Sequence, residues 1–170
     1  MTVRPILSFP DPRLRAPAAP VSLFDDDLRS LAADLLDTMR AAPGIGITAP
    51  HIGISQRLVV IELAAEDGVR TYVNPKIVRA SADRVRHEEG SVSMPGVAEE
   101  VERAARVRVR FQDLAGAEQD EEAEGLLAIC LQHEIDQLDG IFWIQRLSRL
   151  KRDRLVKRFE KLKRGRLSLP

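Results

Sequence analysis

One nine-residue stretch, Gln132 to Gly140 (QHEIDQLDG), limits what this chain can fold into more than any other feature. Apolar residues precede it, no proline interrupts it, and Gly140 lies where a left-handed cap would end a helix. A helix turns about 100° per residue, so His133 and Gln137 project side by side, with Glu134 next to them. A histidine at 137 would complete a His-Glu-x-x-His metal-binding helix, but glutamine stands there instead.

Length and composition indicate one globular domain covering residues 1–170. Hydrophobic residues make up 44% of the chain and charged residues 31%, which is ordinary for a soluble protein with a real core. No apolar run approaches the roughly 18 residues that a membrane span needs, so we expect no membrane partner. Cys130 is the one cysteine and cannot form an intrachain disulfide, which favours a reducing, cytoplasmic location.

The first part of the chain predicts an extended segment followed by a helix. Five of the ten prolines fall in residues 1–20, so we expect this segment to wrap a surface without regular elements. From Leu23 to Met39 apolar residues recur every three or four positions, which predicts an amphipathic helix capped by Ser22 or Asp25.

The middle of the chain is typical of antiparallel strands. Residues 57–63 and 69–78 form a predicted hairpin around Glu66-Asp67-Gly68, and residues 97–101 and 106–111 are two further strands. We expect the buried helix to run from 122 to 138, with a short apolar bridge at 141–147 after it. Strands followed by helices in this order predict an α+β fold.

A basic helix closes the chain. Residues 148–166 hold ten basic and two acidic side chains, a net charge of +8, while the whole chain is neutral. Apolar residues form only a narrow stripe along it. Such a patch favours binding to ribosomal RNA phosphates, and the plain alternative is a solvated helix face.

Two glycine- and proline-bounded apolar segments precede the buried helix. The first is residues 43–53, and the second is residues 89–96. Glycine there lets another backbone come close, although a tight turn at a sheet edge is the simpler explanation of the first segment. The first segment lacks the Lys-Ser/Thr pair of a phosphate-binding loop.

These two segments and the Gln132 stretch resemble, in order, the three signature motifs of the peptide deformylases, metallohydrolases that remove the formyl group from the initiator methionine. Residues 44–51 resemble Gly-x-Gly-Leu-Ala-Ala-x-Gln, and residues 89–93 resemble Glu-Gly-Cys-Leu-Ser. Residues 132–140 match Gln-His-Glu-x-Asp-His-Leu-x-Gly except at Gln137. The likeness continues through residues 10–15, Asn74-Pro75 and Phe142 onward, so it covers nearly the whole chain.

The resemblance implies antiparallel sheets around a central motif-bearing helix, plus a C-terminal helix. It also implies a groove in which a formylmethionyl peptide lies like an added strand. The resemblance implies that the residues contacting this peptide are Ile45, Gly46, His51, Val92, Leu126, Ile129, Cys130 and His133. The last four, on the predicted helix, would line the pocket for the methionine side chain. For Cys130 a small buried hydrophobe is the plain alternative.

The departures from the family pattern fall on the metal ligands. The family holds its metal with the cysteine of the second motif and both histidines of the third, whereas this chain offers Ser91, His133 and Gln137. A serine hydroxyl and an amide are neutral, so we expect no high-affinity cofactor, and at most one divalent metal (Fe, Zn or Ni) at His133. One further alternative is a rebuilt site in which His51 joins His133 and the carboxylate of Glu134.

Two functions therefore stay open. The first is a deformylase relative that keeps the groove for formylated peptide termini but has lost most or all metal-dependent deformylation. The second is an active deformylase with an unusual metal site, in which Glu134 acts as the general base and acid as it does in the family. The partners expected in either case are the N-terminal peptides of nascent chains and, through the basic helix, the ribosome; we expect no DNA partner.

Overall fold

The computed structural model describes residues 2–167. Met1 and residues 168–170, which the expected domain 1–170 includes, lie outside the described residues. The helices are α1 (Asp26–Ala41), α2 (Gly125–Leu138) and α3 (Arg149–Leu167), and the short 3-10 helices are η1 (Pro12–Arg15), η2 (Ala49–Ile52), η3 (Ala65–Asp67) and η4 (Trp143–Arg146). The strands are β1 (Gly46–Thr48), β2 (Leu58–Ile61), β3 (Arg70–Ala80), β4 (Arg84–Ser91), β5 (Met94–Ala104), β6 (Arg106–Gln112) and β7 (Glu118–Glu124).

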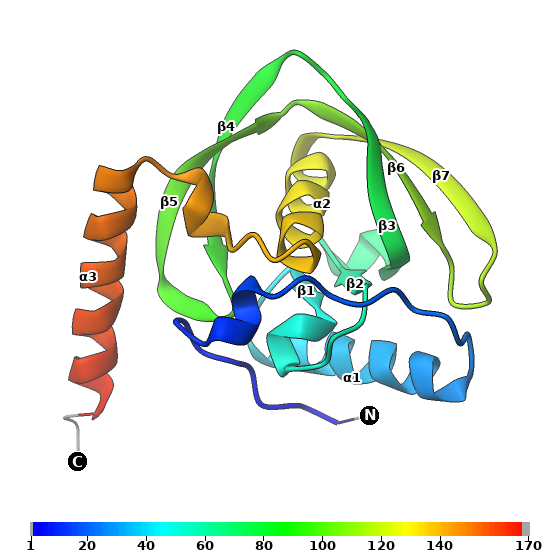
Figure 1. Cartoon of the computed structure of the whole chain (residues 1–170), viewed down its shortest axis with the longest axis horizontal. Coiled ribbons are helices and arrows are strands. Elements are labelled where there is room, and N and C mark those ends of the chain that lie inside the picture. Colours follow the sequence, from blue (N-terminus) through cyan, green and yellow to red (C-terminus); the bar gives the residue numbers. More distant parts are fainter. Residues whose placement is uncertain (1, 168–170) are drawn as a thin grey trace.

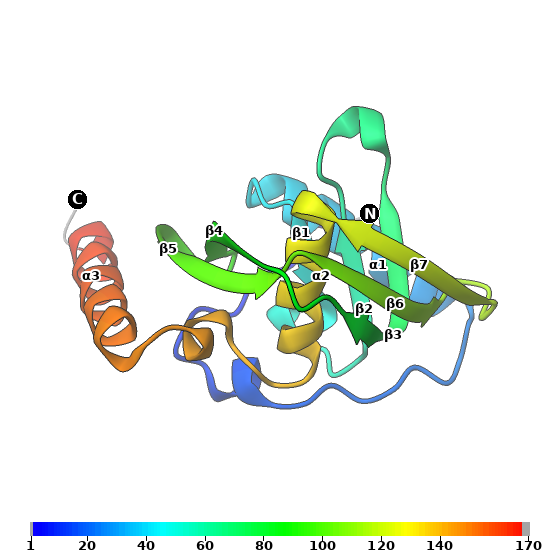
Figure 2. The same cartoon turned by 90° about the horizontal axis from the view of Figure 1, so that it is seen from above.

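The strands form two antiparallel sheets with α2 between them. One sheet has five strands in the order β1-β2-β3-β6-β7, and the other is the β4–β5 hairpin. Figures 1 and 2 show α2 in the middle of the molecule, α1 along one side of the larger sheet, and α3 at the outer side of β5. This arrangement confirms the α+β fold with antiparallel sheets around the motif-bearing helix and a C-terminal helix.

The predicted first helix is present as α1, and of the two predicted caps, Ser22 and Asp25, the structure has Asp25. Asp25 is its N-cap and accepts a hydrogen bond from the Leu28 amide at 3.1 Å. Its apolar face packs on β1 and β2 in one core cluster, with Leu35 and Met39 fully buried. Burial of this face supplies the stability that helix propensity alone does not give.

Residues 118–124 correct the expectation of a helix from 122 to 138. They form β7, and α2 begins only at Gly125. Five of the seven β7 residues are acidic. Three of them face an arginine on β6: the register opposes Arg110 to Asp120, Arg108 to Glu122 and Arg106 to Glu124. Opposite charges facing one another across two strands stabilise a pairing that the acidic sequence of β7 does not itself favour.

The two strands predicted at 97–101 and 106–111 both exist, but they belong to different sheets. The first lies within β5, which pairs with β4, and the second lies within β6, which pairs with β3 and β7. The predicted hairpin of residues 57–78 is β2–β3, with η3 in its connection.

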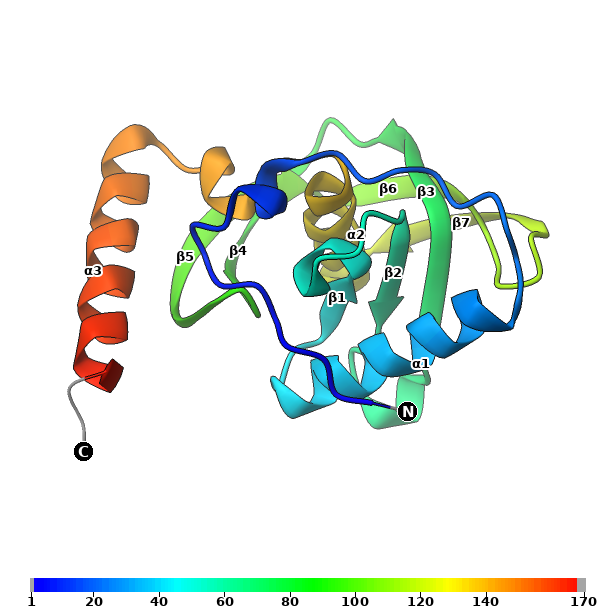
Figure 3. The ribbon, with the colours of Figure 1, turned by 60° about the horizontal axis from the view of Figure 1, so that its bottom comes forward.

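Residues 2–18, the N-terminal strap, run around one side of the molecule. Figure 3 shows the strap passing η2 and the C-terminal end of α2. The expectation that it contains no regular element is wrong at η1, where Asp11 accepts a hydrogen bond from the Arg13 amide and so begins a short 3-10 turn. The rest of the strap has no helix or strand, and it turns at Phe9-Pro10, where the Asp11 amide donates to the Ser8 carbonyl.

The C-terminal helix α3 packs on β5 through Leu155 and Phe159, which are buried. Arg158 donates to the Ala98 carbonyl of β5, while most other Lys and Arg side chains of the helix are exposed. Along residues 2–167, no helix is both long and apolar enough to cross a membrane.

Candidate functional site

The three motif segments meet around one pocket of about 450 Å³. Its walls come from the segment before β1, the turn between β4 and β5, and one face of α2. The lining residues include ten of the positions singled out in the sequence, which are Ile45, Gly46, His51, Ser91, Val92, Leu126, Ile129, Cys130, His133 and Glu134. Gln137 does not line the pocket. His87, on the exposed face of β4, lies at its rim.

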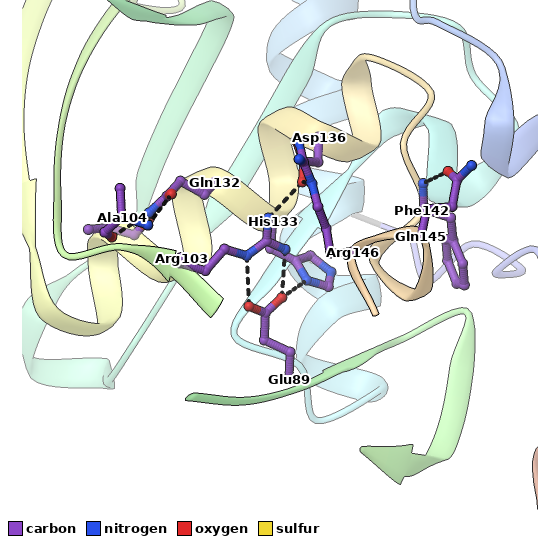
Figure 4. Close-up of polar contacts among 10 residues, drawn as sticks. Glu89, Arg103, Ala104, Gln132, His133, Asp136, Phe142, Gln145 and Arg146 are labelled. Atoms are coloured by element: carbon purple, nitrogen blue, oxygen red, sulfur yellow. Dashed lines mark hydrogen bonds and ion pairs between the residues drawn. The ribbon is translucent and has the colours of Figure 1, made fainter. Parts of the chain in front are cut away.

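His133 is held in a fixed orientation by a carboxylate. Its Nδ1 lies 2.8 Å from Oε1 of Glu89, so Nδ1 carries a proton and donates it to the carboxylate, as Figure 4 shows. Burial lowers the pKa of His133, but the hydrogen bond to Glu89 and the negative charge of Glu134 outweigh burial and raise it. The bond of Nδ1 to Glu89 therefore fixes the orientation of the imidazole, and Nε2 is the ring nitrogen that remains for a ligand in the pocket.

Glu89 itself belongs to a buried charged cluster. Arg103 donates to both oxygens of Glu89, at 2.8 Å each, and to Asp136 at 2.6 Å; Arg146 in turn donates to both Asp136 oxygens. Burial would raise the pKa of Glu89, yet the bonds from Arg103 and His133 lower it to about 2. This cluster, which Figure 4 shows below α2, joins β4, β5, α2 and η4.

The sequence did not single out Arg103 or Asp136. Arg103 lies in a run of charged residues that is typical of an exposed strand. In the fold, however, its side chain is only 4% exposed. The available signal was Glu89, the carboxylate that opens the second motif, because a carboxylate needs a cationic partner once it is buried.

Glu134 faces the pocket with an unpaired oxygen. The residue is 4% exposed, and within the described part of the chain Oε2 has no hydrogen-bond partner. Burial raises the pKa of Glu134 to about 7, against the lowering effect of His133. A β-carbon at position 46 would lie 2.6 Å from Glu134 Oε1 and 2.8 Å from Cys130 Sγ, so only glycine fits there.

His51 presents a hydrogen-bond donor to the pocket. Its Nδ1 accepts a hydrogen bond from the Thr48 amide at 3.0 Å, and because a backbone N–H only donates, the imidazole proton must be on Nε2. Nε2 is buried and has no partner among residues 2–167. Burial and the nearby His133 lower the pKa of His51 to about 3, so the ring is neutral. An Nε2 that carries a proton has no lone pair for a metal, which argues against the rebuilt His51 site.

The two substituted ligand positions are engaged within the protein. Ser91 Oγ accepts a hydrogen bond from the Ser93 amide at 3.1 Å. Gln137, 1% exposed, donates from Nε2 to the carbonyl oxygen of Leu14 at 2.7 Å. Across the described residues, no group of three or more His, Cys, Asp and Glu side chains is arranged to hold a metal ion.

Cys130 is buried in the pocket wall beside Glu134. Burial and the charges of Glu134 and Glu89 raise the pKa of its thiol, so the sulfur stays protonated. In this state it is a small apolar wall residue.

Comparisons with known proteins agree with this geometry. The family model described as polypeptide deformylase matches residues 3–153. A peptide deformylase-like protein of Brucella melitensis is 70% identical over 164 residues, covering 96% of this chain and 100% of its own length. A peptide deformylase of Rhizobium meliloti is 48% identical over 164 residues, covering 95% of this chain and 94% of that protein. The crystal structure of a peptide deformylase from Legionella pneumophila has a TM-score of 0.93 and 42% identity, covering 99% of this chain and 100% of that one.

Proposed function

Because this chain belongs to the peptide deformylase family, we propose that it binds N-formylmethionyl peptide termini in the pocket beside α2 while metal-dependent deformylation is lost or weak. The observation that carries the proposal is that Ser91 and Gln137 are neutral and are already hydrogen-bonded within the protein. A neutral hydroxyl that already accepts from Ser93 and an amide that is bonded to Leu14 do not replace a thiolate and an imidazole. The residues present therefore do not fit the metal of the family, and any divalent ion (Fe, Zn or Ni) at His133 binds weakly.

The groove supports binding of an extended peptide. β1 is at the edge of the five-stranded sheet, so its outer edge at Gly46 is placed to pair with an added strand, while the Ile45 carbonyl already accepts from the Glu62 amide. The apolar wall of Leu126, Ile129 and Cys130, with Val92 opposite, suits a methionine side chain. In this proposal the Nε2–H of His51 donates to the formyl oxygen, which gives that buried donor its missing partner.

Peptide binding in the presence of EDTA tests the groove. We expect formyl-Met-Ala-Ser to bind to the metal-free protein more tightly than Met-Ala-Ser, because a free ammonium group has no acceptor for His51. His51→Phe, which removes the donor, should weaken binding of the formylated peptide by about tenfold, the effect of one buried hydrogen bond. Calorimetry that finds no binding of the formylated peptide would contradict the proposal.

An active deformylase is the second candidate. It is favoured by Glu134, whose pKa of about 7 suits a general base, and by the carboxylate that orients His133 as second-shell groups orient ligating imidazoles. Metal content after purification without oxygen, combined with formate release from formyl-Met-Ala-Ser, separates the two. Stoichiometric metal with turnover that Glu134→Ala abolishes would establish this second function instead.

Restoring the family ligands tests whether only the ligands were lost. We expect Ser91→Cys combined with Gln137→His to bind one divalent metal per chain and to release formate. Either single change should do markedly less, since each leaves a neutral group in the ligand set. A double variant that takes up metal and stays inactive would show that the groove has diverged as well.

We also propose that α3 contacts the ribosome. Most of its Lys and Arg side chains are exposed, and Figure 1 shows this helix at the edge of the molecule, apart from α2. Binding to phosphates by counterion release weakens steeply with salt. Co-sedimentation with ribosomes should therefore be strong at low salt and lost at high salt, and pelleting without salt dependence would count against docking by this helix.

A further inference from the structure

The N-terminal strap makes main-chain bonds to all three motif segments. The Leu7 amide donates to the His51 carbonyl at 2.8 Å, in the first segment. The Phe9 amide donates to the Ser93 carbonyl at 2.9 Å, in the second, and the Ala18 amide donates to the Leu138 carbonyl at 2.8 Å, in the third. The strap therefore lies against every segment that forms a wall of the pocket.

Among residues 2–167, Gln137 makes the one side-chain hydrogen bond from α2 to this strap. Its Nε2 reaches the Leu14 carbonyl, 123 positions away in sequence, and both residues are 1% exposed. Leu14 packs in the cluster that contains Met94, Val97 and Trp143. A buried donor with a short bond to a buried carbonyl is costly to remove, because it would leave both groups unpaired.

The same helix thus has two kinds of polar side chain one turn apart. His133 lines the pocket and is bonded to Glu89 of β4, while Gln137 does not line the pocket and is bonded to Leu14 of the strap. A bound metal would join these elements through its ligands, but here hydrogen bonds between protein groups join them.

We propose that Gln137 is a positioning residue that fastens the strap to α2 and thereby keeps the pocket walls in place without a metal. The inference rests on the proposed function only in taking the pocket as the peptide site. Its structural part, that the strap is ordered by Gln137 in metal-free protein, holds or fails whether or not peptides bind.

Hydrogen exchange on the full-length protein in EDTA tests the proposal. We expect Gln137→Met, which keeps the length of the side chain and removes the donor, to speed exchange of the Leu7, Phe9 and Ala18 amides roughly tenfold, and to weaken binding of formyl-Met-Ala-Ser. Gln132→Met is the matched control. Gln132 lies on the same helix, and its buried amide bonds the backbone of Ala104 and not the strap.

The control separates positioning from a general loss of stability. Gln132→Met should lower global stability without a selective increase of exchange in the strap. The proposal is overturned if Gln137→Met leaves strap exchange as in the wild type, or if both variants change it equally. Wild-type protein supplies a further measurement that does not depend on a variant folding: strap amides should be equally protected in EDTA and in excess Zn²⁺, and protection that appears only with Zn²⁺ would also overturn it.

Discussion

Glu89 accepts hydrogen bonds from Arg103 and from His133 inside the buried cluster, and its pKa of about 2 lies below the ordinary value of 4.5. A carboxyl whose pKa is lower in the folded state stabilises the fold above its unfolded pKa. That stabilisation is lost as pH falls from about 4.5 to about 2, since the folded state then has to take up the proton it resists.

We therefore expect Glu89→Gln to lower the free energy of unfolding by about 3 kcal/mol at pH 7, because Arg103 loses one of its two anionic partners in the described part of the chain and keeps Asp136. The difference between the variant and the wild type should shrink between pH 4.5 and pH 2. Urea titrations at several pH values measure it. Asp26→Asn, which removes the exposed pair with Arg29, should change stability by less than about 1 kcal/mol, and a pH-independent difference for Glu89→Gln would contradict this account.

At this scale the sequence predicted positions better than partners. Ten of the residues named from the sequence line one pocket, because residues of one motif are close in sequence and so stay close in the fold. Two partners come from other elements: Leu14 for Gln137 and Arg103 for Glu89. These two pairings have no local signal, since each depends on how separate elements pack. The Thr48 amide, which sets the tautomer of His51, is only three residues away and belongs to the local turn of η2.

Among the elements, β6 and β7 are held together by charge. Asp120 pairs with both Arg108 and Arg110, and Arg108 also lies 3.8 Å from Glu122. The helix expected from residue 122 was wrong because the acidic run of β7 has no apolar alternation to mark a strand. Its preference comes from the basic strand beside it, which the residues of β7 alone do not reveal.

We expect Asp120→Lys to lower the free energy of unfolding by about 1 kcal/mol, because a cation then faces Arg110 directly and Arg108 nearby. The double variant Arg110→Asp with Asp120→Lys should recover part of the loss. Thermal unfolding at low and high salt measures both effects, since salt should narrow the difference between the single variant and wild type. A double variant less stable than either single one would argue against cross-strand charge pairing.

At the scale of the whole molecule, α3 has two separable faces. Phe159 packs in the cluster of β5 and the strap, with its ring 6.1 Å from that of Phe9, while Lys157 and Lys161 are exposed on the opposite side. The sequence predicted both faces, because the narrow apolar stripe and the basic remainder are local features. It did not predict that the buried face would reach the strap.

The two faces predict two independent losses. Phe159→Ala should lower the free energy of unfolding by about 3–5 kcal/mol, since it removes a buried aromatic ring and leaves a cavity between α3, β5 and the strap. Lys157→Glu with Lys161→Glu should leave stability within about 0.5 kcal/mol and reduce ribosome pelleting at low salt. Urea unfolding and co-sedimentation measured on both variants check the separation. Because α3 packs on the hairpin that supplies Ser91 and Val92, Phe159→Ala should also weaken peptide binding, whereas the charge variant should leave peptide binding unchanged. If the two variants weaken peptide binding equally, the effect does not come from the packing of α3 on the hairpin, which contradicts this account.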